Sequence, residues 1–274
     1  MASSATDSQG KDKDIRQRLV ETGHVDVMIS VGNNFFYTKS LPCSLWFFDR
    51  GKEPERLDKV LFIDARNYYT VVDRTLNEWT DWQLKNLNAI VWLYRGEIEK
   101  YTALLEEYRE ELLRCAVEMK SNDLCGVVNS DASFSDILSA FSAYKEEQAQ
   151  LQKYEIDHVL RRDKKQTEKK WSEIMENIDA AVTVAKEAVW LFDKFGEGEY
   201  RDIPGLCKVG TREEIAAKGW SLTPGAYVGV APQEDDGVDF AHRMSEIHAE
   251  LLELQARSNE LMETISRNIE EMGL

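Results

Sequence analysis

An aromatic cluster at residues 33–42, with the sequence NNFFYTKSLP, is the part of this chain best suited to chemistry. Phe35, Phe36 and Tyr37 follow two asparagines, on a turn between two apolar segments. Exposed rings at the end of a sheet can stack on a base extruded from duplex DNA, because every base offers a flat π-face. The alternative is that the rings only cap the hydrophobic core. The sequence pattern leaves both interpretations open.

The rest of the sequence contains no self-sufficient catalytic or metal-binding pattern. His242 and His248 are six positions apart, whereas two ligands on one helical face need a spacing of about three or four. The FGEGE segment at 195–199 is a poor phosphate loop, because no strand precedes it. The motifs GxSxG, HExxH and GxxxxGK[ST] do not occur. We therefore expect no metal site and no catalytic residue in this sequence.

The charge of the chain argues against a surface that attracts DNA everywhere. Its 274 residues include 34 basic and 50 acidic side chains, a net charge of −16. Attraction to phosphate needs the opposite sign. The charge is uneven, with −1 on residues 1–80, −7 on residues 81–233 and −8 on residues 234–274. The acidic excess therefore concentrates in the later segments.

Three apolar segments predict strands, namely VDVMISV (25–31), PCSLWFF (42–48) and KVLFIDA (59–65). Their nearly continuous apolar character favours strands covered on both faces, as in an α/β sheet. A short helix that stops at Gly23 is predicted before them. Because so few elements bury too little surface for an independent domain, we expect residues 1–80 to be the end of a larger sheet.

Helical periodicity begins near Thr80. Apolar residues then alternate in steps of four and three up to Met119, which predicts one continuous helical seam. A second long helix is predicted from Ala132 to Phe195, with a polar stretch at 161–170 that is either solvated all round or a break. Two long helices joined by a short loop should pack antiparallel, like a coiled coil.

The last predicted element is an amphipathic helix in the acidic segment, after a glycine-rich linker at 195–210. Its apolar stripe consists of Phe240, Met244, Ile247, Leu251, Leu254, Leu261 and Ile265. Such a stripe can dock on a partner protein or on its own chain, and periodicity alone favours neither.

Cysteine usage and hydropathy indicate a cytoplasmic protein. The four cysteines include no CxxC pair, which fits reduced thiols better than disulfides or zinc. No apolar stretch approaches the roughly 20 residues that span a bilayer, and the polar N-terminus is no signal peptide. We expect no membrane partner.

Two long segments resemble a known family. IRQRLVETGHVDVMISVGNNFFYTKSLPCSLWFFDRGK, followed by VLFIDARNYYTVVDRTLNEWTD, resembles the later half of the methyltransferase domain in the modification subunits of type I restriction–modification systems. YRDIPGLCKV, GWSLTPGAYVGV and EDDG resemble the C-terminal part of the same subunits. These subunits methylate adenine N6 in DNA with S-adenosylmethionine. The resemblance covers about 14–95 and 199–272, in the family order.

The resemblance implies roles for particular residues. Phe36, with Phe35 as the alternate, matches the aromatic residue that stacks on the flipped adenine. The helix with the apolar stripe would dock on the specificity subunit, which reads the DNA sequence. The restriction subunit would then be an indirect partner, and DNA a partner in the assembled complex.

The departures from the family predict a partial protein. The family's Asn-Pro-Pro-aromatic motif and glycine-rich cofactor turn are absent. We therefore expect a C-terminal fragment that neither binds S-adenosylmethionine nor methylates DNA alone. Residues 96–198 stand where the family has a short connection, and Ala226 stands where arginine is usual, so a phosphate or carboxylate contact there is in doubt.

The predicted fold is α+β and predominantly α. Residues 1–80 would be the terminal strands of a methyltransferase sheet, residues 81–198 a long antiparallel helical hairpin and an insert, and residues 199–274 a linker and docking helix. The alternative function is a non-catalytic helical scaffold for assembly.

Overall fold

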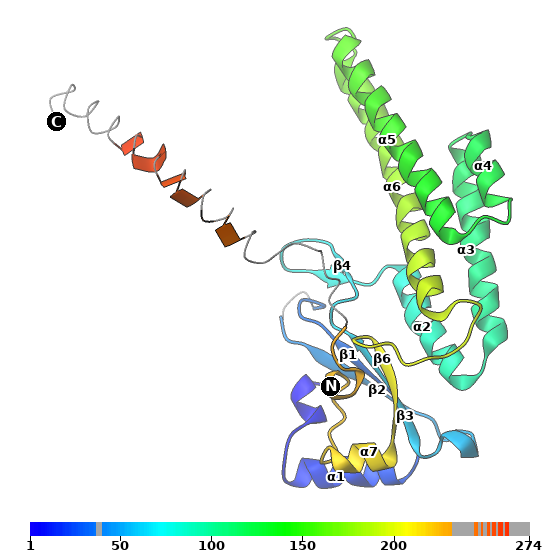
Figure 1. The fold of residues 1–274 in the computed structure, drawn as a ribbon, viewed down its shortest axis with the longest axis vertical. Helices are drawn as coiled ribbons and strands as arrows, with labels where there is room; N and C mark the ends of the chain where they lie inside the picture. The colour runs from blue at the N-terminus through cyan, green and yellow to red at the C-terminus, as the bar shows by residue number, and fades with distance from the viewer. Residues whose placement is uncertain are drawn as a thin grey trace. The chain divides into compact units, whose positions relative to one another are not determined.

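The structure is a computed structural model that describes residues 1–36 and 40–231, together with scattered positions between 244 and 262. It divides into two compact units, Met1–Ala231 and Pro232–Leu274. In the first unit the chain forms most of a sheet, continues into a group of helices and then returns to the sheet (Figure 1). The predicted class, α+β with helix predominating, is confirmed.

The first unit has the following elements in chain order. They are η1 (Ser3–Thr6), α1 (Lys11–Glu21), β1 (Val25–Val31), β2 (Cys43–Phe48), η2 (Pro54–Arg56), β3 (Lys59–Ala65), β4 (Thr70–Val71), β5 (Asn77–Glu78), α2 (Asp81–Arg95), α3 (Ile98–Glu118), α4 (Asn122–Val128), α5 (Phe134–His158), α6 (Lys164–Phe195), β6 (Cys207–Thr211), α7 (Arg212–Ala217) and α8 (Gly225–Val228).

The sheet has the strand order β2-β1-β3-β6 within the described residues. β1 and β3 are parallel, and β2 and β6 join them antiparallel on the outside. Val27 and Ile29 belong to a large core shared with α2, α3 and α6. Met28 and Phe62 belong to a second core shared with α1, α7 and α8. The prediction of strands covered on both faces is therefore confirmed for β1 and β3.

The same prediction is wrong for β2. Phe47 and Phe48 are about half exposed, and β2 pairs only with β1 among the described strands. Apolar, aromatic composition favours a strand, but the faces that become covered depend on where distant helices pack.

The linker predicted at 195–210 is also wrong in its last part, because Cys207–Thr211 forms β6 on the open side of β3. Gly210 reads as a turn signal in the sequence, but it lies under an aromatic ring. A Cβ at this position would be 2.8 Å from Cε2 of Phe62, and that ring stacks on Tyr227 at 3.8 Å between centroids. The glycine therefore makes room for packing and does not end the strand.

The helical seam starts as predicted but is not continuous. Thr80 caps α2, accepting a hydrogen bond from the backbone N–H of Gln83 while the Gln83 side chain accepts one from the N–H of Thr80. Gly96, at φ +77°, then ends α2 in the left-handed conformation. Ile98 falls after this break and is half exposed. The turn at Gly96 changes the direction of the chain. The four-three spacing of apolar residues does not reveal such a change.

The second predicted helix is in fact two helices, α5 and α6, separated at residues 159–163. Contacts along the pair show that the two helices are antiparallel. Glu155, near the end of α5, accepts a hydrogen bond from Trp171, near the start of α6. Farther along, Lys145 and Asp179 form an ion pair. An antiparallel helical hairpin is present, but it lies within residues 132–195, which the sequence predicts as one helix. The predicted hairpin joined that helix to the preceding one.

The second unit is helical at its described positions. Met244, Leu251, Leu254 and Leu261 of the predicted stripe lie in this helix and are about half exposed. Phe240, Ile247 and Ile265 lie outside the described residues. None of the described helices is both long enough and apolar enough to cross a membrane.

Candidate functional site

The loop after β1 is fixed at the carboxyl end of the parallel strands. Asn77 of β5 donates two hydrogen bonds to this loop, from its backbone N–H to the carbonyl of Asn34 (2.7 Å) and from its side chain to the carbonyl of Asn33 (3.0 Å). Asn34 has φ +64°, a left-handed conformation that asparagine tolerates. Gly32 lies so close to the carbonyl oxygen of Arg66 that a Cβ would be 2.8 Å from it. The loop therefore has a defined path to the aromatic residues that follow.

The two phenylalanines of this loop differ in their surroundings. The Phe35 ring packs against Trp79 at 4.8 Å and Tyr69 at 5.9 Å between centroids, and it is partly buried. The Phe36 ring is 48% exposed. Tyr37 lies outside the described residues. The core-capping interpretation therefore describes Phe35, whereas Phe36 keeps a ring available for stacking.

A buried polar network connects this aromatic cluster to α6. Trp79 donates a hydrogen bond from its indole N–H to the carbonyl of Tyr68 (2.6 Å), and the Tyr68 hydroxyl donates to Glu187 (2.5 Å). The fully buried Asn86 donates to the Tyr68 hydroxyl (2.9 Å) and accepts a hydrogen bond from Tyr108 (2.8 Å). Burial, reinforced by the Glu187 carboxylate, raises the pKa of Tyr68 and Tyr108. Both phenols therefore stay protonated as donors.

An arginine–aspartate pair follows β3 on the same edge of the sheet. Arg66 donates two hydrogen bonds to Asp64, at 2.8 and 2.6 Å, and this contact raises the pKa of the guanidinium. Gly225, at the start of α8, lies against the pair, since a Cβ there would be 2.7 Å from Nη2 of Arg66. The Arg66 guanidinium thus lies beside Gly225, next to Ala226, the position where arginine is usual in the family that the sequence resembles. The Asp-x-Arg spacing at the end of a predicted strand could have indicated this pair.

A charge cluster lies at the opposite end of β1. The register of β1 against β2 is irregular between Val25 and Val27, and the fully buried Asp26 carboxylate between them meets three cations. Arg95 donates to it at 2.5 and 3.2 Å, while Arg56 and Lys52 lie at 3.5 and 3.7 Å. The Lys52 ammonium also donates to the carbonyls that flank β1 and β3. This arrangement ties the strands to helix α2.

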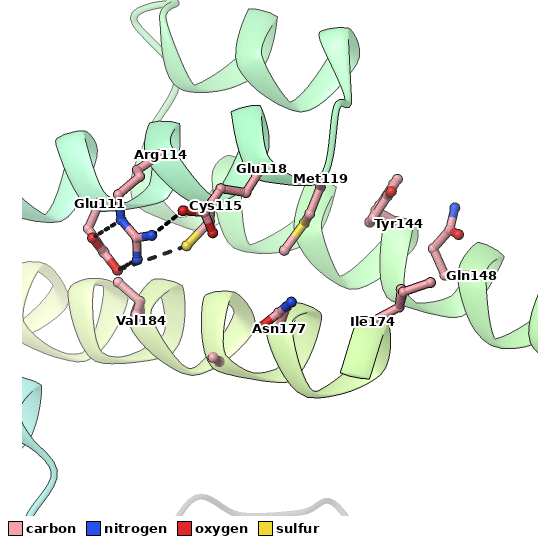
Figure 2. A pocket seen from close by; sticks show the side chains of 11 residues that line it. Glu111, Arg114, Cys115, Glu118, Met119, Tyr144, Gln148, Ile174, Asn177 and Val184 are labelled. Atoms are coloured by element: carbon pink, nitrogen blue, oxygen red, sulfur yellow. Dashed lines mark hydrogen bonds and ion pairs between the residues drawn. The ribbon is translucent and has the colours of Figure 1, made fainter. Parts of the chain in front are cut away.

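A hollow of about 380 Å³ lies between α3, α5 and α6 (Figure 2). Its walls include Met119, Tyr144 and Ile174. Arg114 lines it with its guanidinium hydrogen-bonded to Glu111 and Glu118, which lowers the pKa of Glu111. Because its cation is already neutralised by two carboxylates, the hollow is poorly suited to an anion.

Within the described residues, no three His, Cys, Asp or Glu side chains gather closely enough to hold a metal ion. All four cysteines are free thiols. Burial raises the pKa of Cys207 to about 11 and also raises that of Cys115. These thiols are therefore poor nucleophiles at neutral pH.

Comparison with known proteins shows what this chain is similar to. The model of the N-6 DNA Methylase family matches residues 1–111, which contain the loop, the aromatic cluster and α2. The HindI methylase subunit of a type I restriction enzyme from Haemophilus influenzae is 25% identical over 99% of this chain. The MjaIX methylase subunit from Methanocaldococcus jannaschii is 23% identical over 100% of this chain. The chain is thus similar to type I methylase subunits over its whole length.

The chain spans only 38% and 31% of the length of these two type I methylase subunits. A solved structure of the methyltransferase subunit of a type I restriction–modification system from Streptococcus thermophilus is 13% identical, with a TM-score of 0.36, and covers 82% of this chain and 25% of that one. The match to the family model ends within α3. Whether residues 96–198 are an insert stays a prediction.

Proposed function

We propose that this chain supplies the base-stacking and subunit-docking parts of a type I N6-adenine DNA methyltransferase. The observation that carries the proposal is the difference in burial between the neighbouring rings of Phe35 and Phe36. Phe35 anchors the loop in an aromatic cluster, and Phe36 is left half exposed at the carboxyl end of the parallel strands. Ligands of open α/β sheets bind at that edge. A flipped adenine would stack on the Phe36 ring.

The residues present do not fit S-adenosylmethionine, which the relationship to methylase subunits implies as the methyl donor. Gly32 approaches the backbone of Arg66, and the turn beside it is hydrogen-bonded to Asn77. This loop contains a single glycine, which packs against the Arg66 carbonyl, so it is not a glycine-rich turn of the kind that receives the cofactor. The sequence also lacks the Asn-Pro-Pro-aromatic motif. We infer that residues outside this sequence supply the cofactor site and the catalytic motif, and that the chain alone is inactive.

Calorimetry tests the inferred inactivity. Titration of S-adenosylmethionine into the 274-residue chain should give no saturable heat, and the chain should transfer no methyl group to duplex DNA. Saturable binding would contradict the inference. The assembled enzyme, with its specificity subunit, is the positive control.

The proposed partners follow from the same relationship. The apolar stripe around Leu251 and Leu261, half exposed on an acidic helix, is suited to docking on the specificity subunit. That subunit would bring DNA and, indirectly, the restriction subunit. We expect this assembly in the cytoplasm, where it would meet DNA.

Base stacking is tested in the assembled enzyme with 2-aminopurine at the target adenine, because this base fluoresces more strongly when it leaves the stack. Phe36→Ala should reduce methylation by about 5- to 150-fold, which corresponds to the loss of roughly 1–3 kcal/mol of stacking, and should lower the fluorescence gain. Assembly should be unchanged. Phe36→Tyr, which keeps an aromatic face, should restore most of the activity. Normal methylation and fluorescence in Phe36→Ala would refute the stacking role.

A second candidate function, a non-catalytic assembly scaffold, is favoured by the long α5–α6 hairpin. Co-purification tests whether the C-terminal helix docks on the specificity subunit, as the first proposed function requires. Leu251→Asp with Leu261→Asp should abolish capture by the specificity subunit. The same change at Leu252 and Met262, which are exposed and outside the stripe, controls for added charge. Retained capture by the double leucine variant would remove the docking role of this helix.

A further inference from the structure

The connection between α5 and α6, together with the first turns of α6, is strongly basic, in contrast to the rest of the chain. Residues 161–170 contain six cationic and two acidic side chains, a net charge of +4 within a chain of −16. The cations are all exposed. They are Arg161, Arg162, Lys164, Lys165, Lys169 and Lys170. We refer to residues 161–170 as the basic tip.

The charge of the basic tip is only partly neutralised within the protein. Arg161, Lys164 and Lys165 take part in none of the ion pairs found among the described residues. Lys169 and Lys170 approach carboxylates only at 3.9 Å, with both partners exposed in each pair. Exposed pairs of this kind contribute little. Several positive charges of the tip therefore remain available to an external partner.

The hairpin holds the basic tip on a stiff support. α5 has 25 residues and α6 has 32, so they extend about 37 and 48 Å at 1.5 Å per residue. Buried Trp171 hydrogen-bonds to Glu155 across the hairpin just behind the tip (2.7 Å). Figure 1 shows that the α5–α6 connection lies at the end of the hairpin farthest from the sheet. A rigid, projecting group of cations is suited to an extended polyanion.

Flat side chains lie next to these cations. The Tyr154 ring, 65% exposed, stacks on His158 at 4.2 Å between centroids. The His158 Nδ1 atom lies 2.8 Å from the carbonyl oxygen of Tyr154, which fixes the imidazole in this position. Hydroxyl and imidazole groups of this kind commonly contact phosphate oxygens beside lysine and arginine.

We propose that the basic tip binds the phosphate backbone of duplex DNA. It acts without reading sequence, because lysine and arginine contacts to phosphate position a protein but do not specify bases. The choice of DNA as the polyanion rests on the proposed function. The hairpin would thus give a chain of −16 a local attachment to DNA, away from the loop that carries Phe36.

The test measures binding of the 274-residue chain to a fluorescent duplex of arbitrary sequence, by polarisation at several salt concentrations. The tip variant combines Arg161→Gln, Arg162→Gln, Lys164→Gln and Lys165→Gln. It should bind at least about tenfold more weakly, and the slope of log K against log salt should fall by roughly 3, since each phosphate contact contributes about 0.9. The control variant removes the same charge elsewhere, with Lys11→Gln, Arg18→Gln, Arg50→Gln and Lys186→Gln, at exposed positions. It should change affinity less than about threefold.

Three results would overturn the proposal. They are equal affinities of the tip and control variants, no saturable binding of the parent chain at low salt, and a preference for anionic vesicles or single-stranded RNA over duplex DNA. Circular dichroism checks that the tip variant keeps the helical content of the parent. This assay uses the 274-residue chain and measures neither methylation nor base extrusion, so a failure of the tip is distinguishable from a failure of base stacking in the assembled enzyme.

Discussion

Neighbouring residues in the loop after β1 have opposite surroundings. Side chains of extended backbone alternate in direction, so Phe35 can enter the aromatic cluster only if Phe36 points elsewhere. Trp79 and Tyr69, which follow in the sequence by more than 30 positions, decide which ring is packed. The rings are therefore equivalent in the sequence and different in the fold.

Stability measurements should separate the two rings. Phe35→Ala removes a partly buried ring from contact with Trp79, so it should lower the free energy of unfolding by about 2–3 kcal/mol. Phe36→Ala should lower it by less than about 1 kcal/mol, since the ring is 48% exposed. Urea denaturation of both variants measures this difference. Equal losses would mean that Phe36 is also a core residue.

The buried Lys52 predicts a pH dependence of stability. Burial, partly offset by Asp26, lowers the pKa of Lys52 from 10.5 to about 8. Below pH 8 Lys52 is charged in both the folded and the unfolded protein, so the folded protein bears the full free-energy cost of burying the charge. Between pH 8 and 10.5 the unfolded chain binds more protons, so the free energy of unfolding should rise with pH, by at most about 3 kcal/mol.

Urea titrations of Lys52→Met and the parent, compared at pH 7.5 and 9.5, isolate this contribution. The variant should lack the rise, whereas Lys11→Met at an exposed position should keep it. Buried tyrosines and Cys207, whose pKa is raised to about 11, oppose the rise at high pH but contribute equally to both proteins. Parallel pH profiles of parent and Lys52→Met would be evidence against a buried, charged Lys52.

At the scale of elements, β6 is a strand that the local sequence pattern does not predict. Its residues, CKVGT, pair with β3 in a register that runs from Lys59–Thr211 to Ile63–Cys207. The two strands are more than 140 positions apart in sequence. A glycine within such a strand usually weakens the strand pattern, but here it accommodates Phe62.

Two glycine-to-alanine changes test this packing. Gly210→Ala places a Cβ 2.8 Å from the Phe62 ring, so it should destabilise the protein by about 1–3 kcal/mol. Gly126→Ala, within α4 and with open space around its Cβ position, should stabilise it by about 0.5–1 kcal/mol. Thermal unfolding of both variants gives the signs. A stabilising Gly210→Ala would contradict the close approach of Phe62.

At the scale of the whole molecule, the charge pattern follows the architecture. The first 80 residues, which contain the loop with Phe36, are nearly neutral. Acid concentrates on the helices, and the basic tip is a local exception. A single net charge of −16 therefore describes no particular surface of this protein.

The two units predict a simple effect of truncation. Removal of residues 232–274 should leave the melting temperature of residues 1–231 within about 2 °C, because residues 1–231 form a compact unit by themselves. The truncated chain should no longer capture the specificity subunit. Calorimetry and co-purification measure the two effects, with Leu251→Asp and Leu261→Asp in the full chain as the matched control. A large fall in melting temperature would show that the second unit belongs to the core of the first.

The sequence by itself determined what depends on nearby residues. Apolar runs predicted β1, β2 and β3, Thr80 marked the start of α2, and the aromatic loop was identified as the candidate site. Long segments of similarity also indicated the type I methylase relationship. These signals are local because backbone conformation, capping and side-chain periodicity act over a few residues.

Only the tertiary structure decided which groups meet across the chain. It placed β6 beside β3, gave Asp26 its three cations, joined Tyr68 to Glu187, and left Phe36 exposed while Phe35 was packed. Each outcome depends on contacts between residues that lie far apart in the sequence. The free energy of such contacts comes from burial and packing geometry, which residue types alone do not encode.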